Sequence, residues 1–200
     1  MLAEKYNEMI EKTIHGTLKR LPEIKRAAEM VAEAVNRGKR IFVVDRYGVI
    51  DSEVAEKPAG LLLFRPLVNS GEKLMEGDIL VLSSFQPEDE KDLEIVKEAH
   101  DLGAKVISIS PDGQLVKNSD MGVPDLDGEM NAVLNIDRAG LSFAPLSGII
   151  HVLIIYMIEA ETVERLLAIG KKPAVSYAEY MDGGAAKLLE ARKKFASQGY

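Results

Sequence analysis

Residues 77–110 run GDILVLSSFQPEDEKDLEIVKEAHDLGAKVISIS and contain the alternation that decides the fold. Two short apolar runs, 79–82 and 106–109, are typical of strands covered on both faces. Between them, residues 87–102 have the length of a helix and carry acids at its start, where the positive end of the helix dipole favours them. Gly103 follows as a stop signal. A strand, a helix and a second strand in this order predict a parallel pair with a right-handed crossover.

The same alternation continues on both sides of this segment. Further strands are expected at 41–45 (IFVVD), 61–64 and 132–136, and further helices at 1–18, 22–38, 51–57, 145–169 and near 184–197, whereas the irregular stretch 121–130 is expected to be a surface loop. We therefore predict an α/β fold, a three-layer α-β-α sandwich around a five-stranded parallel, flavodoxin-like sheet. The length of 200 residues suits a single domain over 1–200, with 1–20 and 171–200 as helical extensions.

Composition excludes several classes of function. The net charge of -7 argues against nucleic acid as a partner, because such binding relies on Lys and Arg contacts to phosphate. The chain has no cysteine, which excludes disulfides, a thiol nucleophile and thiolate zinc sites. No His-x-x-x-His or comparable metal motif is present, and no cofactor is expected.

The apolar run 149–158 is shorter than the about 20 residues of a membrane span and predicts a core or subunit-interface helix. We expect a cytoplasmic protein without a membrane partner.

Ligands of open α/β sheets bind beyond the carboxyl ends of the strands, and three loops qualify. They are residues 45–52, residues 83–86 and residues 142–147. The second loop, with Ser83, Ser84 and Gln86 before a predicted helix, is the best candidate for phosphate, because free backbone N–H groups at a helix start attract anions. The alternative is that its serines cap the helix.

The other two loops leave their own alternatives open. Arg46, beside Tyr47 and Gly48, can hold a phosphate through a charge-assisted contact, or it can pair with Asp45 or Asp51. Ser147 can donate to the ligand or cap the long helix that follows.

The order of elements, the 77–110 segment and the tail KKPAVSYAEYMDGGAAKLLEARKKF (171–195) resemble the sugar isomerase (SIS) family. The tail is similar to that of a bacterial subgroup of uncharacterised sugar isomerases related to phosphoheptose isomerases. The resemblance covers nearly the whole chain. It implies a five-stranded parallel sheet, a homodimer or homotetramer, and a sugar phosphate as ligand.

The resemblance also implies site residues. The family grips phosphate with a serine-rich turn after the third strand, which falls here on Ser83 and Ser84. The family's glycine is missing from this turn and Phe85 stands nearby. The loop with Arg46 departs further from the family pattern, whereas the Pro-x-Ser turn ending at Ser147 is kept.

Aldose–ketose isomerisation requires a base that moves a proton between adjacent carbons, usually Glu or His. The subgroup has a Glu after the first loop, and Glu53 or Glu56 matches it. His151, one turn after Ser147, is the third catalytic candidate; the alternative is a buried core or interface histidine. We expect a phosphosugar-binding protein with isomerase activity. The alternatives are a non-catalytic sensor or regulatory module, and a structural subunit whose pocket Phe85 and Tyr47 fill.

Overall fold

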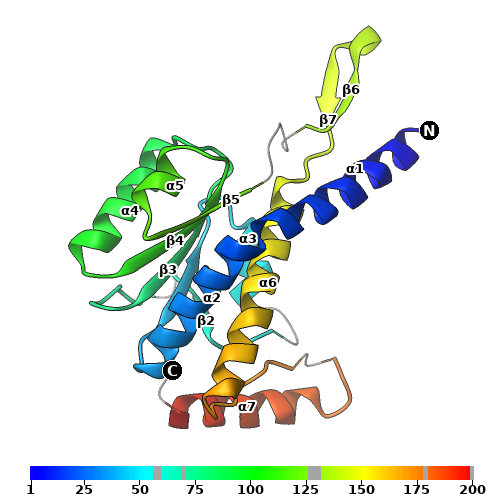
Figure 1. Cartoon of the computed structure of the whole chain (residues 1–200). Helices are drawn as coiled ribbons and strands as arrows, with labels where there is room; N and C mark the ends of the chain where they lie inside the picture. Colours follow the sequence, from blue (N-terminus) through cyan, green and yellow to red (C-terminus); the bar gives the residue numbers. More distant parts are fainter. Residues whose placement is uncertain (56–59, 69–70, 126–131, 178–179, 199–200) are drawn as a thin grey trace.

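The computed structural model describes residues 1–200 except 56–59, 69–70, 126–131, 178–179 and 199–200 (Figure 1). Its elements, in chain order, are α1 (Leu2–Thr17), η1 (Leu18–Arg20), α2 (Leu21–Asn36), β1 (Ile41–Val44), α3 (Val49–Ala55), β2 (Phe64–Pro66), β3 (Ile79–Ser83), α4 (Glu90–Asp101), β4 (Lys105–Ser110), α5 (Gln114–Asn118), β5 (Met121–Pro124), β6 (Leu134–Ile136), η2 (Asp137–Ala139), β7 (Leu141–Phe143), α6 (Ser147–Ala168) and α7 (Gly184–Gln198).

The main sheet has five parallel strands in the order β2-β1-β3-β4-β5. This order reverses between β1 and β3, as in flavodoxin-like sheets, so loops from both strands meet at one edge. The predicted fold class is therefore confirmed.

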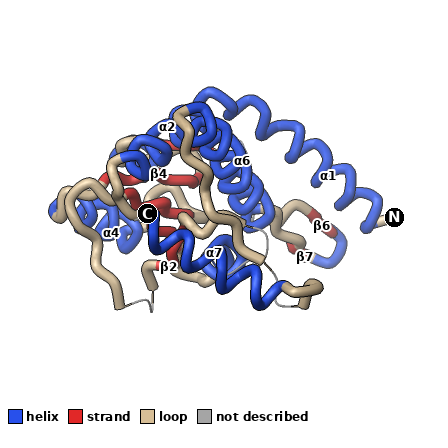
Figure 2. The backbone as a smooth tube through the Cα atoms, turned by 90° about the horizontal axis from the view of Figure 1, so that it is seen from below, coloured by secondary structure: helices blue, strands red, loops and turns tan. Residues whose placement is uncertain are grey.

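Helices cover both faces of this sheet, and alternate side chains of each strand decide which face they join. In β1, Ile41 and Val43 face the core shared with α2 and α6, whereas Phe42 and Val44 face the core shared with α4 and α5. Figures 1 and 2 show α2 and α6 side by side on one face. Burial on both faces explains why the strands have continuous apolar sequences.

The fifth strand of the sheet corrects the sequence prediction. It is β5, which pairs with β4 and lies in the stretch expected to be a loop. The run predicted as the last strand instead contributes β6, which forms an antiparallel hairpin with β7 beside the far end of α1 (Figure 1). The sequence signal of β5 is weak because it is a four-residue edge strand in which Val123 alone is fully buried.

Two predicted boundaries also shift. The second strand covers 64–66 rather than 61–64, and Leu61 makes an isolated antiparallel bridge with Val175. The crossover helix α4 begins at Glu90, because the Asp89 carboxylate accepts hydrogen bonds from the backbone of the first turn and caps it. The segment between Ser83 and α4 is consequently longer than expected.

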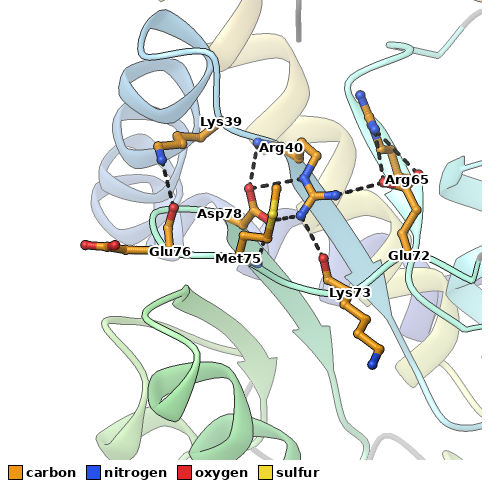
Figure 3. Close-up of polar contacts among 8 residues, drawn as sticks. All are labelled: Lys39, Arg40, Arg65, Glu72, Lys73, Met75, Glu76 and Asp78. Atoms are coloured by element: carbon orange, nitrogen blue, oxygen red, sulfur yellow. Dashed lines mark hydrogen bonds and ion pairs between the residues drawn. The ribbon is translucent and has the colours of Figure 1, made fainter.

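An ion-pair network braces the amino ends of β1 and β3, away from the ligand edge (Figure 3). Arg40 and Asp78 directly precede these strands. Buried Asp78 accepts from the backbone N and from Nη2 of Arg40, at 3.1 and 2.5 Å, and from the backbone of Met75 at 2.9 Å. The guanidinium also reaches Glu72, which in turn pairs with Arg65. The network therefore ties the loop before β3 to the start of β1.

The apolar run 149–158 lies within α6, where Ile150, Ile154, Ile155 and Ile158 are buried against α2 and the sheet. Within the described residues, none of the helices combines the length and apolar character that crossing a membrane requires.

Candidate functional site

Three buried polar side chains form a hydrogen-bonded relay at the carboxyl edge of the sheet. Ser83 ends β3, Asp125 directly follows β5, and His151 lies in the second turn of α6. Ser83 Oγ is 2.8 Å from His151 Nδ1, and His151 Nε2 is 3.0 Å from Asp125 Oδ2. The exposed fraction is 1% for Ser83, 0% for His151 and 3% for Asp125. The sheet order brings the ends of β3 and β5 close enough for one imidazole to bridge them.

The hydrogen positions of this relay follow from its chemistry. When Asp125 is ionised it only accepts, so the hydrogen on the contact between them belongs to Nε2 of His151. If the imidazole is also neutral, Nδ1 is an acceptor and receives the hydroxyl hydrogen of Ser83. In that ionic form the Ser83 hydroxyl hydrogen points to His151 rather than to a ligand.

Two aromatic rings connect this relay to the surface. The Phe85 ring packs on the His151 ring at a centroid distance of 5.1 Å, and Tyr47 stacks on Phe85 at 5.8 Å. Tyr47 is exposed, whereas Phe85 is half-buried. The rings come from the loops after β1 and β3, so the two ligand loops predicted from the sequence do meet. Their contact covers the relay.

Asp45 holds the first loop through its backbone. Its carboxylate accepts from the backbone N–H of Tyr47 at 2.6 Å and from that of Ile50 at the start of α3. Gly48 turns the chain in between with a φ of +71°, a left-handed conformation that glycine adopts without strain. A carboxylate of the chain therefore occupies the N–H groups that could receive an anion.

Arg46 is paired with two carboxylates of the α4 region. Its Nε lies 2.6 Å from Asp92, and its Nη2 contacts Asp89. The hydrogen bond to Asp92 raises the pKa of Arg46 above its ordinary value. The guanidinium also lies over the Tyr47 ring, 5.5 Å from its centroid. The sequence predicts Asp45 or Asp51 as the alternative partner of Arg46, whereas these two contacts are with aspartates of the crossover segment.

The serine turn after β3 is closed by local hydrogen bonds. The hydroxyl of buried Ser84 donates to the Gln86 carbonyl at 3.0 Å, and the Gln86 N–H donates back to Ser84 Oγ at 3.3 Å. The Ser84 N–H donates to Ile109 and extends the pairing of β3 with β4. Gln86 is exposed. Neither serine caps α4, because Asp89 does so.

Ser147 is buried and opens α6, beside the loop that carries Gly48. A Cβ atom on the next residue, Gly148, would lie 3.2 Å from Val49, so the starts of α6 and α3 approach closely. The preceding Ala144 adopts a left-handed φ of 66°, and the hydroxyl of Tyr6 in α1 donates to the Pro145 carbonyl at 3.1 Å. The third predicted loop thus borders the first.

Of the two predicted carboxylate bases, Glu53 lies on α3 and is exposed. The Tyr156 hydroxyl of α6 donates to Glu53 Oε1 at 2.8 Å. Burial, and then this hydrogen bond, raise the pKa of Tyr156 above its ordinary value, so Tyr156 remains a donor. Glu56 lies outside the described residues.

Sequence reasoning missed Asp125, Asp89 and Tyr156. Asp125 follows β5, which lies in the stretch that the sequence predicts as a loop, so the sequence does not mark it as a strand end where ligands bind. Among the described residues, no cluster of His, Asp and Glu side chains is arranged to hold a metal ion.

Comparison with known proteins shows which fold this architecture shares. No family model and no curated protein matches the sequence. Solved structures do match, and one of them is a phosphoheptose isomerase from Francisella tularensis. It shares 20% sequence identity with this chain and superposes with a TM-score of 0.57. The match covers 81% of this chain and 98% of that chain. The fold is that of the sugar isomerase (SIS) proteins.

Two other matches cover more of the chain. A hypothetical protein from Methanococcus jannaschii, inferred to be a 3-hexulose-6-phosphate isomerase, shares 15% identity over 94% of this chain and 97% of that chain, with a TM-score of 0.58. The sugar isomerase domain of an RpiR transcription factor from Sphaerobacter thermophilus shares 12% identity over 98% of both chains, with a TM-score of 0.58. These likenesses establish the SIS fold that the sequence resemblance implied.

Proposed function

We propose that this protein binds a phosphorylated sugar at the turn of Ser83, Ser84 and Gln86, next to the aromatic pair Tyr47 and Phe85. The observation that carries the proposal is the position of this turn, at the carboxyl end of the central strand β3, where the loops of β1 and β3 meet. A phosphate oxygen can replace the local bond of the Ser84 hydroxyl. An aromatic face packs against the apolar C–H face of a sugar ring. The SIS-fold isomerases that resemble this chain act on sugar phosphates, according to their names.

We further propose isomerisation between aldose and ketose phosphates, with Glu53 as the base. Glu53 is exposed, which suits a group that must reach substrate, and Tyr156 holds its carboxylate in place. Ser147 and Gly48 border the same edge and are proposed to contact the sugar. In this proposal Arg46 breaks its ion pair with Asp92 or Asp89 and binds the phosphate instead.

A non-catalytic binding module is the second candidate, and one observation favours it. His151 is fully buried and both of its ring nitrogens are hydrogen-bonded within the chain, so in this conformation it cannot exchange a proton with substrate. A sugar isomerase domain of this fold also occurs in a transcription factor. Such a module binds a sugar phosphate without turning it over.

The deciding experiment is a thermal-shift screen with fructose 6-phosphate and sedoheptulose 7-phosphate against the unphosphorylated sugars. A ligand that binds the folded state alone raises Tm by linkage. We expect a shift with a phosphorylated sugar that Ser84→Ala weakens. Ser119→Ala is the matched control, because Ser119 makes a local backbone bond at the opposite edge, before β5, and should not change the shift.

Each outcome selects one function. A shift together with interconversion of the ketose and aldose phosphates supports the isomerase. A shift without turnover supports the non-catalytic module. The absence of any shift in a folded protein contradicts both, and favours a structural subunit whose pocket Tyr47 and Phe85 close.

For the assembly, we propose a homodimer or homotetramer in the cytoplasm. Support for the assembly comes from two exposed apolar side chains, Ile14 of α1 and Leu18 of η1, which lie beside Leu153 and Met157 of α6.

A further inference from the structure

The hydrogen-bonding direction of the relay restricts what Ser83 can offer a ligand. Ser83 has one hydroxyl hydrogen, and beside a neutral His151 that is bonded to Asp125 this hydrogen occupies the 2.8 Å contact to Nδ1. A ligand oxygen that reaches Ser83 Oγ then meets lone pairs alone. A phosphate dianion also presents lone pairs alone, so the two oxygens repel each other.

Rotation of the hydroxyl toward the ligand does not solve this problem for a neutral imidazole. The rotated hydroxyl would leave Nδ1 of His151 as an acceptor without a donor, in a site without solvent exposure. Buried polar groups that lose their partner are costly. The relay as built therefore opposes phosphate binding by Ser83.

A proton on His151 removes the conflict. A doubly protonated imidazole donates from Nε2 to Asp125 and from Nδ1 to Ser83 Oγ, which frees the Ser83 hydrogen for the ligand. The Asp125 carboxylate, 3.0 Å away, balances the new charge. We infer that binding of a sugar phosphate dianion at Ser83 takes up one proton, which His151 holds between Ser83 and Asp125.

His151 is in this view a positioning residue, because it sets the polarity of the serine without touching substrate. The inference rests on the proposed function. It states that the site binds the phosphate as a dianion while His151 takes up one proton.

The groups around His151 agree with this assignment. The Phe85 ring packs on the imidazole and can stabilise a cation there. From η1, Arg20 donates to the backbone carbonyl of Asp125 at 3.2 Å, and Asp125 Oδ2 contacts the imidazole. In the adjoining loop, the Asp45 carboxylate is bonded to the backbone of Tyr47 and Ile50, and Arg46 is paired with the carboxylates of α4.

Isothermal titration calorimetry with fructose 6-phosphate tests the inference. At pH 8.0 the ligand is a dianion, since the second pKa of a phosphate monoester is about 6. Titrations in HEPES and in Tris, which differ in ionisation enthalpy, give the number of protons exchanged. We expect uptake approaching one proton, and a Kd that rises up to about tenfold per pH unit above pH 7. Binding with equal heats in both buffers overturns the inference.

Variants assign the proton to the relay. Ser83→Ala should bind more weakly and without proton uptake, because no hydroxyl then needs to be turned; its thermal melt verifies folding. His151→Gln should also abolish uptake. His100→Gln is the matched control, because His100 makes a similar 2.9 Å contact to Asp120 at the surface and should leave uptake unchanged.

The outcomes separate the two proposals. Binding by the wild type without proton exchange overturns the inference and leaves the proposed function standing. Persistent uptake in Ser83→Ala assigns the proton to another group and also overturns it. Failure of fructose 6-phosphate and sedoheptulose 7-phosphate to bind a folded protein overturns both.

Discussion

Aspartates of the chain already hold the candidate ligand groups of the proposed site. Asp45 accepts from the backbone of the first loop, and Asp92 and Asp89 hold Arg46. If the proposal is right, a ligand anion competes with these carboxylates. At the residue scale, affinity depends on how easily each of these pairs is exchanged.

Asp92→Asn should tighten sugar phosphate binding, because it releases Arg46 from its stronger partner. We expect a Kd about fivefold lower, corresponding to roughly 1 kcal/mol. The free energy of unfolding should fall by about 1–3 kcal/mol, because the buried amide that replaces Asp92 holds Arg46 less strongly. Calorimetry and urea unfolding measure the two effects. An unchanged or weaker affinity would exclude Arg46 from the phosphate site.

Glu53→Gln should strongly reduce turnover while binding is retained, because the proposed base is removed. General base catalysis contributes about 10²–10⁴-fold, so kcat should fall by that range with little change in Kd. Glu98→Gln, an exposed carboxylate of α4, is the control and should leave kcat unchanged. Equal activity in Glu53→Gln and wild type would remove Glu53 from the mechanism.

At the scale of elements, the two edges of the sheet have different roles. The carboxyl edge brings together the loops of β1 and β3, the end of β5 and the start of α6. The amino edge carries the ion-pair network of Arg40 and Asp78, which fixes the starts of β1 and β3 (Figure 3). Because the strands are rigid and parallel, positions fixed at one edge also set the spacing of the loops at the other.

Asp78→Ala should destabilise the fold strongly. It leaves the guanidinium of Arg40 and the N–H of Met75 without their buried acceptor, and we expect a loss of about 3 kcal/mol in the free energy of unfolding. Glu72→Ala removes a more exposed partner of the same arginine and should cost less than about 1 kcal/mol. Urea unfolding of both variants tests the difference. Equal losses would contradict the central position of Asp78.

At the scale of the whole molecule, α1 and the β6–β7 hairpin extend beyond the sheet and its helices (Figure 1). An open apolar groove lies where α1 and η1 meet α6, lined by Ile14, Leu18, Leu153 and Met157 among others. Apolar side chains in this position suit a two-fold symmetric contact with a second copy.

Light scattering of the wild type should therefore give a mass of at least two chains. Ile14→Glu combined with Leu18→Glu should reduce it to one, because two charges would be buried in the contact. Lys12→Glu, an exposed residue of the same helix, is the control for added negative charge. A wild-type mass of one chain would contradict the proposed assembly.

The sequence by itself determined the α/β class, the positions of most strands of the parallel sheet and the position of the serine turn. These features depend on local periodicity, which continuous apolar strands and amphipathic helices display along the chain. Tertiary structure alone decided that Met121–Pro124 completes the sheet, since an edge strand with a single fully buried side chain has no strong pattern. It also decided the relay of Ser83, His151 and Asp125. These residues are 26 to 68 positions apart, and their contact arises from the order of the strands rather than from any spacing in the sequence.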